Sequence, residues 1–392
     1  MSSRQAAIVG AGIGGLTAAL ALATRGWAVT VLERRTGFAE AGAGIQLSPN
    51  ASHVLIGLGL GGALRRAASE PGRVVIRDLR SGGAIGEVAL GPFVRERFEA
   101  PYYVIHRREL QTILLDAIRA RPDIRLLLGR KVVAASDGPD GVALSLDRSA
   151  GADPLRPDVL IGADGVWSTL RHALGDQRAP VYAGYVAWRT TLPVAVAPDE
   201  TLSRDTGLWL GAGGHVVHYP VEGGRRLNVV AFEKRATPVE GWAAPGDPQD
   251  LARIFARAAP ALRALIAQPA EWRLWSLFDL PVKRMAQGRI ALLGDAAHSV
   301  LPFLAQGGAL AIEDAAVLAA TLSAADAVPV ALKAYEAQRL GRARRVQNAA
   351  RRNGRIFHAG PLVAAARNLV IRRVGAHGMA NRYAWIYGWT PP

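Results

Sequence analysis

The 392-residue sequence predicts a mixed α/β fold, in which a parallel sheet with helices is joined to an antiparallel sheet and closed by a helical tail. Three observations lead to this prediction. A strand-helix-strand pattern opens the chain, short alternating segments rich in Pro and Gly occupy the middle, and α/β texture returns near residue 281. The length also exceeds that at which one hydrophobic core stops growing. We therefore expect a discontinuous first domain, residues 1–180 and 281–327, an inserted domain, residues 181–280, and a C-terminal helical segment, residues 328–392.

The elements of the first domain follow from apolar runs between glycines. Residues 6–9 read as a buried strand, residues 12–25 as a helix and residues 28–33 as a second strand. Another helix is expected at about residues 109–120. Strands around residues 73–105 are expected to join the antiparallel sheet.

The inserted domain and the tail differ in texture. Alternation at residues 207–210 and 215–219 predicts antiparallel strands. The strand-like residues 289–293 then lead into Ala-rich helical sequence up to about residue 324, and residues 328–392 are helical and Arg-rich.

Charge and cysteine content narrow the function classes. Against 32 Asp and Glu the chain has 47 Lys and Arg, giving a charge of +15, but the arginines are scattered, so a nucleic-acid-binding stripe is not indicated. The densest basic run, Arg339 to Arg355, is interpreted as a solvated helix face, or as a surface that attracts an anionic substrate or nucleotide phosphates.

The lack of cysteine excludes disulfides, thiolate metal sites and Cys nucleophiles and favours a reducing cytoplasm. No metal site is predicted. Without a signal peptide or a run of roughly 20 apolar residues, integral membrane association is not expected.

The first chemical motif lies between the first strand and the first helix. It reads Gly10-Ala11-Gly12-Ile13-Gly14-Gly15, with the pattern G-x-G-x-x-G. The first glycine makes a tight turn, the second lets the backbone approach a pyrophosphate, and the third lets helix and strand pack closely. Glu33, with Arg34 beside it, ends the second strand and can accept hydrogen bonds from ribose hydroxyls. Dinucleotide binding follows, although NAD and FAD both use such a unit.

Two further segments distinguish between these cofactors. Gly162-Ala163-Asp164-Gly165 is followed by Ser168 and Arg171, and Gly294-Asp295-Ala296-Ala297-His298 is followed by Pro302, Gln306, Gly307 and Gly308. They resemble the D-G and G-D segments of the FAD-dependent class A, or single-component, aromatic hydroxylases. The resemblance covers nearly the whole chain. It implies a Rossmann-like FAD-binding domain, with the inserted domain binding substrate.

The resemblance also implies roles for particular residues. Asp295 would contact the flavin-side ribose, and Asp164 would serve both FAD and nicotinamide binding. The free N–H groups of the helix beyond Asp295 would face the negative flavin. His298 would mainly support the structure around the flavin. The whole expected cofactor set is Gly10, Gly12, Ile13, Gly14, Gly15, Glu33, Arg34, Gly44, Ile45, Gln46, Arg107, Gln111, Asp164, Gly165, Gly294, Asp295, Pro302, Gln306, Gly307 and Gly308.

Two shorter matches belong to this set. Gly44-Ile45-Gln46 stands where the backbone of such hydroxylases runs beside the isoalloxazine, and Arg107 with Gln111 resembles their R-x-x-L-Q pattern. Arg107 could contact a phosphate or the flavin edge. The alternative is an ordinary solvated cation beside Arg108.

The candidate catalytic residues are His215 and Tyr219. They stand four apart in an expected strand, so both should lie on one face, with His218 on the other. The resemblance implies a His and a Tyr that bind and deprotonate the substrate. His215 is then the candidate base or proton relay, and Tyr219 could hold a ring hydroxyl or carboxylate. A structural histidine and a packed tyrosine remain the alternative.

The pocket wall is expected to include Phe303. Some relatives place a polar residue near this position, so a phenylalanine argues against hydroxypyridine or 3-hydroxybenzoate specificity and for a more apolar wall. Tyr185, Trp188 and Arg189 are further pocket candidates. Such residues are also ordinary in cores and on surfaces.

The implied reaction is hydroxylation of a small, phenolic-acid-like ring. NADH or NADPH would reduce FAD, and dioxygen would form a flavin C4a-hydroperoxide that attacks the ring. The single G-x-G-x-x-G unit fits transient nicotinamide binding, and Trp272 and Trp275 do not form the W-x-W pattern of flavin halogenases. The alternatives are a related monooxygenase for a quinone-pathway, isoprenoid or antibiotic substrate, and a flavin-binding protein without turnover. The protein is expected to act as a monomer or homodimer.

Overall fold

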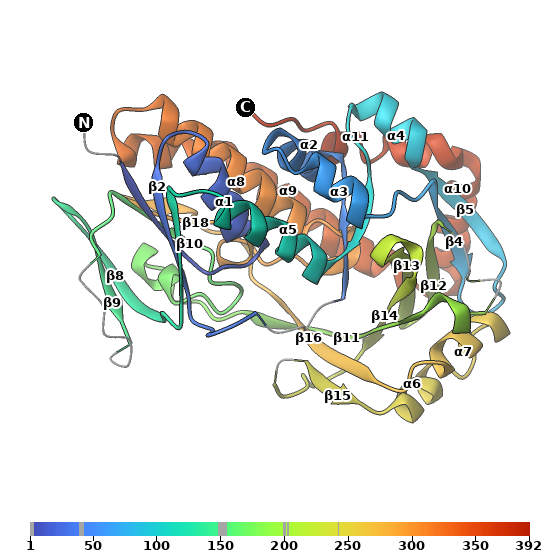
Figure 1. Cartoon of the computed structure of the whole chain (residues 1–392). Coiled ribbons are helices and arrows are strands. Elements are labelled where there is room, and N and C mark those ends of the chain that lie inside the picture. The colour runs from blue at the N-terminus through green and yellow to red at the C-terminus, as the bar shows by residue number, and fades with distance from the viewer. Residues whose placement is uncertain (1–3, 39–42, 148–154, 199–200, 202–203, 242) are drawn as a thin grey trace.

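Six strands form the first sheet of the computed structural model, which describes residues 4–38, 43–147, 155–198, 201, 204–241 and 243–392 (Figure 1). Their order is β17-β18-β10-β1-β2-β7. The bounds are β1 Gln5–Val9, β2 Ala28–Glu33, β7 Ile124–Leu128, β10 Val159–Gly162, β17 Ala286–Gln287 and β18 Ile290–Leu292. Neighbouring strands run parallel except for the β17-β18 pair. The three central strands are short, apolar and almost wholly buried, as expected where helices or loops cover both faces.

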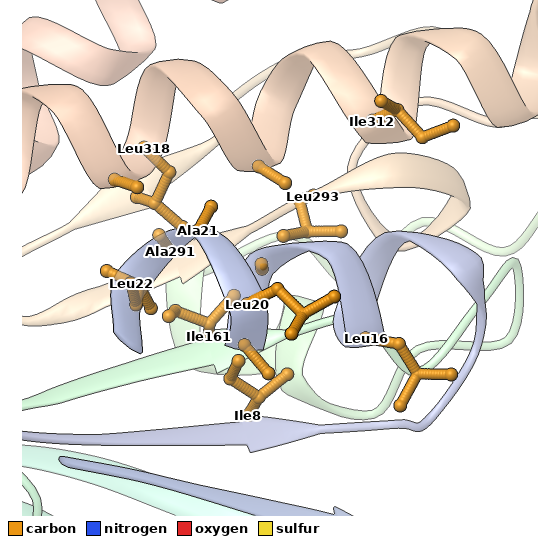
Figure 2. Close-up of a cluster of buried hydrophobic side chains, with 14 of the residues drawn as sticks. Ile8, Leu16, Leu20, Ala21, Leu22, Ile161, Ala291, Leu293, Ile312 and Leu318 are labelled. Atoms are coloured by element: carbon orange, nitrogen blue, oxygen red, sulfur yellow. The ribbon is translucent and has the colours of Figure 1, made fainter. Parts of the chain in front are cut away.

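Helix α1, Ile13–Ala23, lies against this sheet, with all its residues buried. Helix α8, Gly307–Ala324, and helix α5, Arg107–Arg119, pack beside it. Figure 2 shows α1 between the strands that carry Ile8 and Ile161 and the helix α8 that carries Ile312 and Leu318. Among the described helices, α8 alone is long and apolar enough to cross a membrane, but 72% of it is buried in the protein, as in the core helix of a globular fold.

Eight strands form the second sheet, in the order β15-β16-β11-β14-β13-β12-β4-β5. The bounds are β4 Arg73–Asp78, β5 Ala84–Ala89, β11 Val181–Pro193, β12 Thr206–Gly211, β13 Gly214–Val221, β14 Arg226–Lys234, β15 Ala244–Gly246 and β16 Trp272–Asp279. Neighbours are antiparallel except β12 and β4. Helices α6, Pro248–Ile254, and α7, Pro260–Ala267, pack on one face. The opposite face of the second sheet packs against the rest of the molecule.

The remaining elements connect the two sheets. Two strand pairs are β3, Gly44–Leu47, with β6, Tyr103–His106, and β8, Val132–Gly138, with β9, Gly141–Leu146. The other helices are α2 Pro49–Gly57, α3 Gly61–Ala67, α4 Gly91–Phe98, α9 Val328–Phe357, α10 Pro361–Asn381 and α11 Ala384–Tyr387. Helix α9 contacts β17 of the first sheet, and the residue after it contacts β13 of the second (Figure 1).

The mixed α/β class with a helical C-terminus is confirmed. The first helix is shorter than expected, and β6, at the end of the 73–105 segment, pairs with β3 rather than with the second sheet. The interpretation of the Arg339 to Arg355 run as a solvated face is wrong at its start, because Arg339 is only 1% exposed. It faces two acidic residues of α8, which offset the cost of burying its charge.

Candidate active site

The glycine loop after β1 is shaped by close backbone contacts. Gly10 has a φ of 106°, and a Cβ there would lie 2.4 Å from the carbonyl oxygen of Ala163. A Cβ on Gly15 would lie 2.0 Å from the carbonyl oxygen of Gly10. A Cβ on Gly12 would meet nothing within 4 Å. The first and third glycines thus serve the turn and the packing, and the middle one leaves its backbone open to a ligand.

Glu33 and Gln111 hold this loop from two sides. Glu33 Oε2 accepts a hydrogen bond from the Ala11 N–H at 2.9 Å, and Gln111 Nε2 donates to the Ala11 carbonyl at 3.0 Å. The other oxygen of Glu33 accepts from the Arg35 N–H at 3.0 Å, whereas Arg34 is exposed. Glu33 therefore orders the loop directly, and a ribose would share its carboxylate with the backbone.

The D-G and G-D segments lie next to each other because Arg171 joins them. Its Nε donates to the Ala296 carbonyl at 3.0 Å and its Nη2 to the Val166 carbonyl at 2.6 Å. Asp164 Oδ2 accepts from the Thr169 N–H at 2.8 Å. Its Oδ1 is buried without a hydrogen-bond partner among the described residues. An unsatisfied buried carboxylate oxygen is costly, which suits a residue that binds a ligand hydroxyl.

Asp295 combines two properties expected of a carboxylate that binds a ligand. Its side chain is accessible to solvent, yet the surrounding protein raises its pKa by desolvation, an effect that the nearby Arg107 partly opposes. Arg107 itself is exposed. A cation and a carboxylate therefore lie close together at this edge of the first sheet, beyond the carboxyl ends of β1 and β18, where ligands bind in open α/β sheets.

A buried ionic network centred on Asp314 of α8 holds the G-D segment in place. Asp314 of α8 accepts from the Gly294 N–H at 2.9 Å, from His298 Nε2 at 2.6 Å and from Arg339 Nε at 2.7 Å. Burial opposes its ionisation, but the charges of His298 and Arg339 hold the pKa of Asp314 at about 2. Burial likewise lowers the pKa of His298, but the neighbouring Asp314 outweighs it and raises the pKa. The His298 ring is thus held by its hydrogen bond to Asp314, which fits the structural role expected for His298.

Strand β3 lies between α8 and the second sheet. A Cβ on Gly44 would lie 2.4 Å from Tyr219 Cε2, and the Gly44 N–H donates to Asn228 Oδ1 at 2.6 Å. On its other side, a Cβ on Gly308 would lie 2.6 Å from Ile45 Cδ1. The expected flavin strand and the expected catalytic tyrosine are therefore in contact, and only glycine at position 44 permits it.

The Gln306 side chain faces the protein. Its Nε2 donates to Ser48 Oγ at 2.9 Å, and its Oε1 accepts from Asn50 Nδ2 at 3.1 Å. Asn50 also donates to Glu313 of α8. Gln306 precedes α8, which begins at Gly307, and Pro302 opens the short 3-10 turn before it. A contribution of Gln306 to cofactor binding thus falls to its backbone.

Tyr219 and Arg189 lie on the face of the second sheet that looks away from α6 and α7. Tyr219 is buried, and burial raises its pKa, although Arg189 and a hydrogen bond with Gln46 oppose this. Burial, followed by the charge of Arg107, lowers the pKa of Arg189 to about 10. The Nε of Arg189 is buried without a hydrogen-bond partner in the described part of the chain, and its guanidinium carbon lies 5.2 Å from the Trp275 ring centroid. A cation in this state attracts an anion.

His215 lies further along the same face of β13 in an aromatic cluster. Its ring stacks on Phe232 at a centroid distance of 4.4 Å and meets Phe303 edge-on at 5.5 Å. His218 instead lies near Trp209, on the opposite face. Phe303 also contacts Tyr185 at 5.1 Å. Phe303 therefore contributes an apolar wall beside His215. Trp188 is instead buried in the core between the second sheet and helices α6 and α7.

Several site residues escaped the sequence analysis. Asn228 contacts Gly44, Asp314 anchors the G-D segment, and His358 contacts His215 at 2.7 Å. Asp314 had a signal, since it stands beside Glu313 in an otherwise apolar helix. Asn228 and His358 had none, because their partners are distant in sequence and no motif includes them.

These features fit FAD. The open backbone at Gly12, the unsatisfied Asp164 Oδ1 and the accessible Asp295 carboxylate provide what a pyrophosphate and two sets of hydroxyls require. In the part of the chain that the structure describes, no three His, Asp or Glu side chains gather as metal ligands do.

The fold and this site define a dinucleotide-binding flavoprotein with a second, mostly antiparallel sheet. The sequence profile of the FAD binding domain family matches residues 3–350. The chain is 34% identical to 3-hydroxybenzoate 6-hydroxylase of Klebsiella oxytoca, covering 98% of this chain and 96% of that protein. It is 38% identical to a 3-amino-4-hydroxybenzoate 2-monooxygenase of Streptomyces platensis, with 97% and 95% covered.

A solved structure agrees with these sequence relatives. Klebsiella pneumoniae HpxO complexed with FAD and uric acid superimposes with a TM-score of 0.84 at 32% identity, covering 96% of each chain. The chain therefore belongs to the FAD binding domain family and, within it, to the FAD-dependent aromatic hydroxylases.

Replacing Asp295 by alanine is expected to lower FAD affinity by about tenfold or more, because a hydrogen bond to a charged group contributes about 1.5–3 kcal/mol. Flavin absorbance per protein after gel filtration, and FAD titration of the apoprotein, measure the effect. Asp140→Ala, which removes an exposed carboxylate in the turn between β8 and β9, is the control. Equal FAD retention by the two variants would contradict the assignment.

Proposed function

We propose that this enzyme hydroxylates a small phenolic acid with NADH or NADPH and dioxygen, and that it does so in the reducing cytoplasm. The observation that carries the substrate class is that Tyr219, which packs on Gly44, and Arg189, whose buried Nε has no described partner, lie on the same face of the second sheet. The tyrosine hydroxyl suits a ring hydroxyl, and the guanidinium suits a carboxylate. The two sequence relatives from Klebsiella oxytoca and Streptomyces platensis are named as enzymes that act on hydroxybenzoates. The absence of cysteine supports the compartment.

The chain's own residues would bind and orient the ring. Bound FAD supplies the electron transfer and oxygen activation that no side chain can provide. Burial raises the pKa of Tyr219, so its hydroxyl remains a donor at neutral pH. Phe303 and Phe232 keep water away from the ring.

His215 would accept the proton of the substrate's ring hydroxyl. Burial, and next the charge of His358, hold its pKa well below 6.5, so the imidazole is neutral and has a lone pair at physiological pH. An ionised phenol is the more electron-rich ring. The same low pKa means that His215 retains a proton poorly and has to pass it on.

The proposal is tested by NAD(P)H oxidation by the flavin-loaded protein with a panel of aromatic compounds. Although Phe303 taken alone argues against 3-hydroxybenzoate, the names of the two sequence relatives favour hydroxybenzoates. We therefore expect 3-hydroxybenzoate or an amino-hydroxybenzoate to stimulate oxidation and to gain one oxygen by mass spectrometry. The matched 3-hydroxybenzyl alcohol, which lacks the carboxylate, should require a much higher concentration. Hydroxypyridines and quinone precursors complete the panel. A preference for the neutral compounds would overturn the acid assignment.

Replacing His215 by glutamine is expected to lower kcat for the stimulating substrate by about a hundredfold, the usual effect of losing a general base. FAD content should stay normal, since the contacts that His215 makes in the described part of the chain are with Phe232, Phe303 and the C-terminal end of α9. His218→Gln, a buried histidine on the opposite face of the same strand, is the control. An unchanged kcat in His215→Gln would remove His215 from the proton transfer.

A further inference from the structure

His215 has a second histidine as its hydrogen-bond partner. Its Nδ1 lies 2.7 Å from Nε2 of His358, 143 positions later in the chain. His358 is the C-cap of α9, and both histidines are buried, at 1% and 5% exposed. The contact thus connects the second sheet to the long helix α9, which also contacts β17 of the first sheet.

The surroundings of this pair are mostly aromatic rings. Phe232, Phe303 and Phe357 contact His215 at centroid distances of 4.4 to 5.5 Å. Tyr185 lies 5.0 Å from His358. Burial, with a smaller contribution from Lys234, lowers the pKa of His358 to about 4. Neither imidazole is therefore charged at neutral pH.

Two neutral imidazoles 2.7 Å apart share one proton. One nitrogen of the contact must carry it and the other must offer its lone pair, because two N–H groups or two lone pairs would repel. When His215 Nδ1 carries the proton, its Nε2 has the lone pair, and His358 carries its own proton on Nδ1. The pair then has a proton acceptor at one end and a donor at the other.

We propose that His215 and His358 form a two-step proton relay that carries the proton of the substrate's ring hydroxyl away from the substrate. This deepens the proposed function and rests on it. The substrate O–H bond breaks as a bond to His215 Nε2 forms, and the shared proton moves from His215 Nδ1 to His358 Nε2. The proton on His358 Nδ1 passes to a water molecule that reaches this nitrogen, since no described protein group accepts it. The ring becomes a phenolate, and neither imidazole accumulates charge, as their apolar surroundings require.

The outer end of the relay is the Nδ1 atom of His358. His358 Nδ1 is buried and has no hydrogen-bond partner among the described residues. A histidine that served only to hold His215 would gain by satisfying this nitrogen as well. The unpaired nitrogen is the atom from which the relay releases its proton, and the charge of Lys234 disfavours keeping a second proton on the ring.

The test follows proton release when the flavin-loaded enzyme binds 3-hydroxybenzoate, by stopped flow in weak buffer with a pH indicator. His358→Gln keeps a polar group beside His215 but cannot transfer a proton through it. We expect its proton release to slow by about tenfold or more, with FAD content and the Kd for 3-hydroxybenzoate within a few-fold of the parent. His218→Gln, a buried histidine outside the pair, should release protons at the parental rate.

Imidazole rescue separates a relay from simple packing. In His358→Ala, added imidazole should restore most of the proton-release rate. A folded, FAD-loaded His358→Ala variant that imidazole does not rescue would overturn the relay, as would parental release in His358→Gln. If the parent enzyme hydroxylated a ring acid of the panel without releasing a proton on binding it, the relay would fail and the proposed function would stand. A parent enzyme that hydroxylated no ring acid would overturn the proposed function. Release that depends on His215 and not on His358 would leave that function intact.

Discussion

Replacing Gly15 by alanine is expected to abolish stable FAD binding and to destabilise the protein without cofactor. The new Cβ would lie 2.0 Å from the Gly10 carbonyl oxygen and 3.2 Å from the Ala163 Cβ. The first of these is backbone in a loop that is itself pressed against the Ala163 carbonyl, so no side chain can swing away. Helix α1 would have to move off β1, at about 1–3 kcal/mol for overpacking, and its N-terminus would leave the pyrophosphate position.

Gly12→Ala is the matched control for this variant. A Cβ at position 12 meets no protein atom within 4 Å, so the apoprotein should unfold at nearly the parental urea concentration. FAD binding should still weaken, because the methyl group points where backbone and pyrophosphate approach. Urea midpoints of the two apoproteins and FAD titrations separate the effects. A Gly15→Ala protein with parental midpoint and flavin content would refute the packing argument.

The glycine loop was predictable because its physics is local. Spacing, a preceding strand and a following helix suffice to define the turn. Gly10 and Gly12 lie between β1 and α1 as expected, and Gly15 lies in the first turn of α1. The class of fold followed from similar local evidence. The period-2 alternation of residues 215–219 likewise separates His215 from His218, which the sheet places on opposite faces.

Contacts between distant elements were not predictable in the same way. The partner of His215 lies 143 residues away on a helix end, and nothing in the sequence around His358 indicates that contact. Gln306 matched a flavin-side motif, but its amide faces Ser48 and Asn50, which a motif does not reveal. Such side-chain directions depend on how α8 packs against α2, and a single sequence does not contain that information.

The error at Arg339 has a specific physical cause. Arginine is almost never fully buried unless it is paired, so a run of arginines favours a solvated face. Here the pairs come from Glu313 and Asp314, two adjacent acids within an Ala-rich helix. The available signal for the burial of Arg339 was this pair of acids, because they stand in an apolar helix that has to be buried. They require cations from a neighbouring element, and α9 supplies them.

Replacing Arg339 by methionine is expected to destabilise the protein by about 3–5 kcal/mol, because it leaves two buried carboxylates short of a positive partner. Arg339 is 1% exposed, and its side chain bonds Asp314 at 2.7 Å and Glu313 at 2.7 Å. Methionine fills similar space, so the lost charge dominates the effect. Arg342→Met is the control, since Arg342 is partly exposed and its loss leaves Arg339 on Glu313. Urea unfolding at pH 7.5 measures both, and equal midpoints would contradict the argument.

The pH dependence of stability gives an independent check on the same network. The pKa of Asp314, about 2 against 3.8 in an unfolded chain, means that its contribution is complete above about pH 4 and is lost as the pH falls toward 2. Without Arg339, only His298 and the Gly294 N–H favour the carboxylate, so the folded-state pKa rises. The stabilising shift then shrinks or reverses sign. In Arg339→Met, Asp314 should therefore begin to be protonated at a higher pH than in the parent. The free energy of unfolding of the variant should fall less steeply between pH 4 and pH 2. A purely steric defect would instead lower the whole curve of stability against pH without changing its slope.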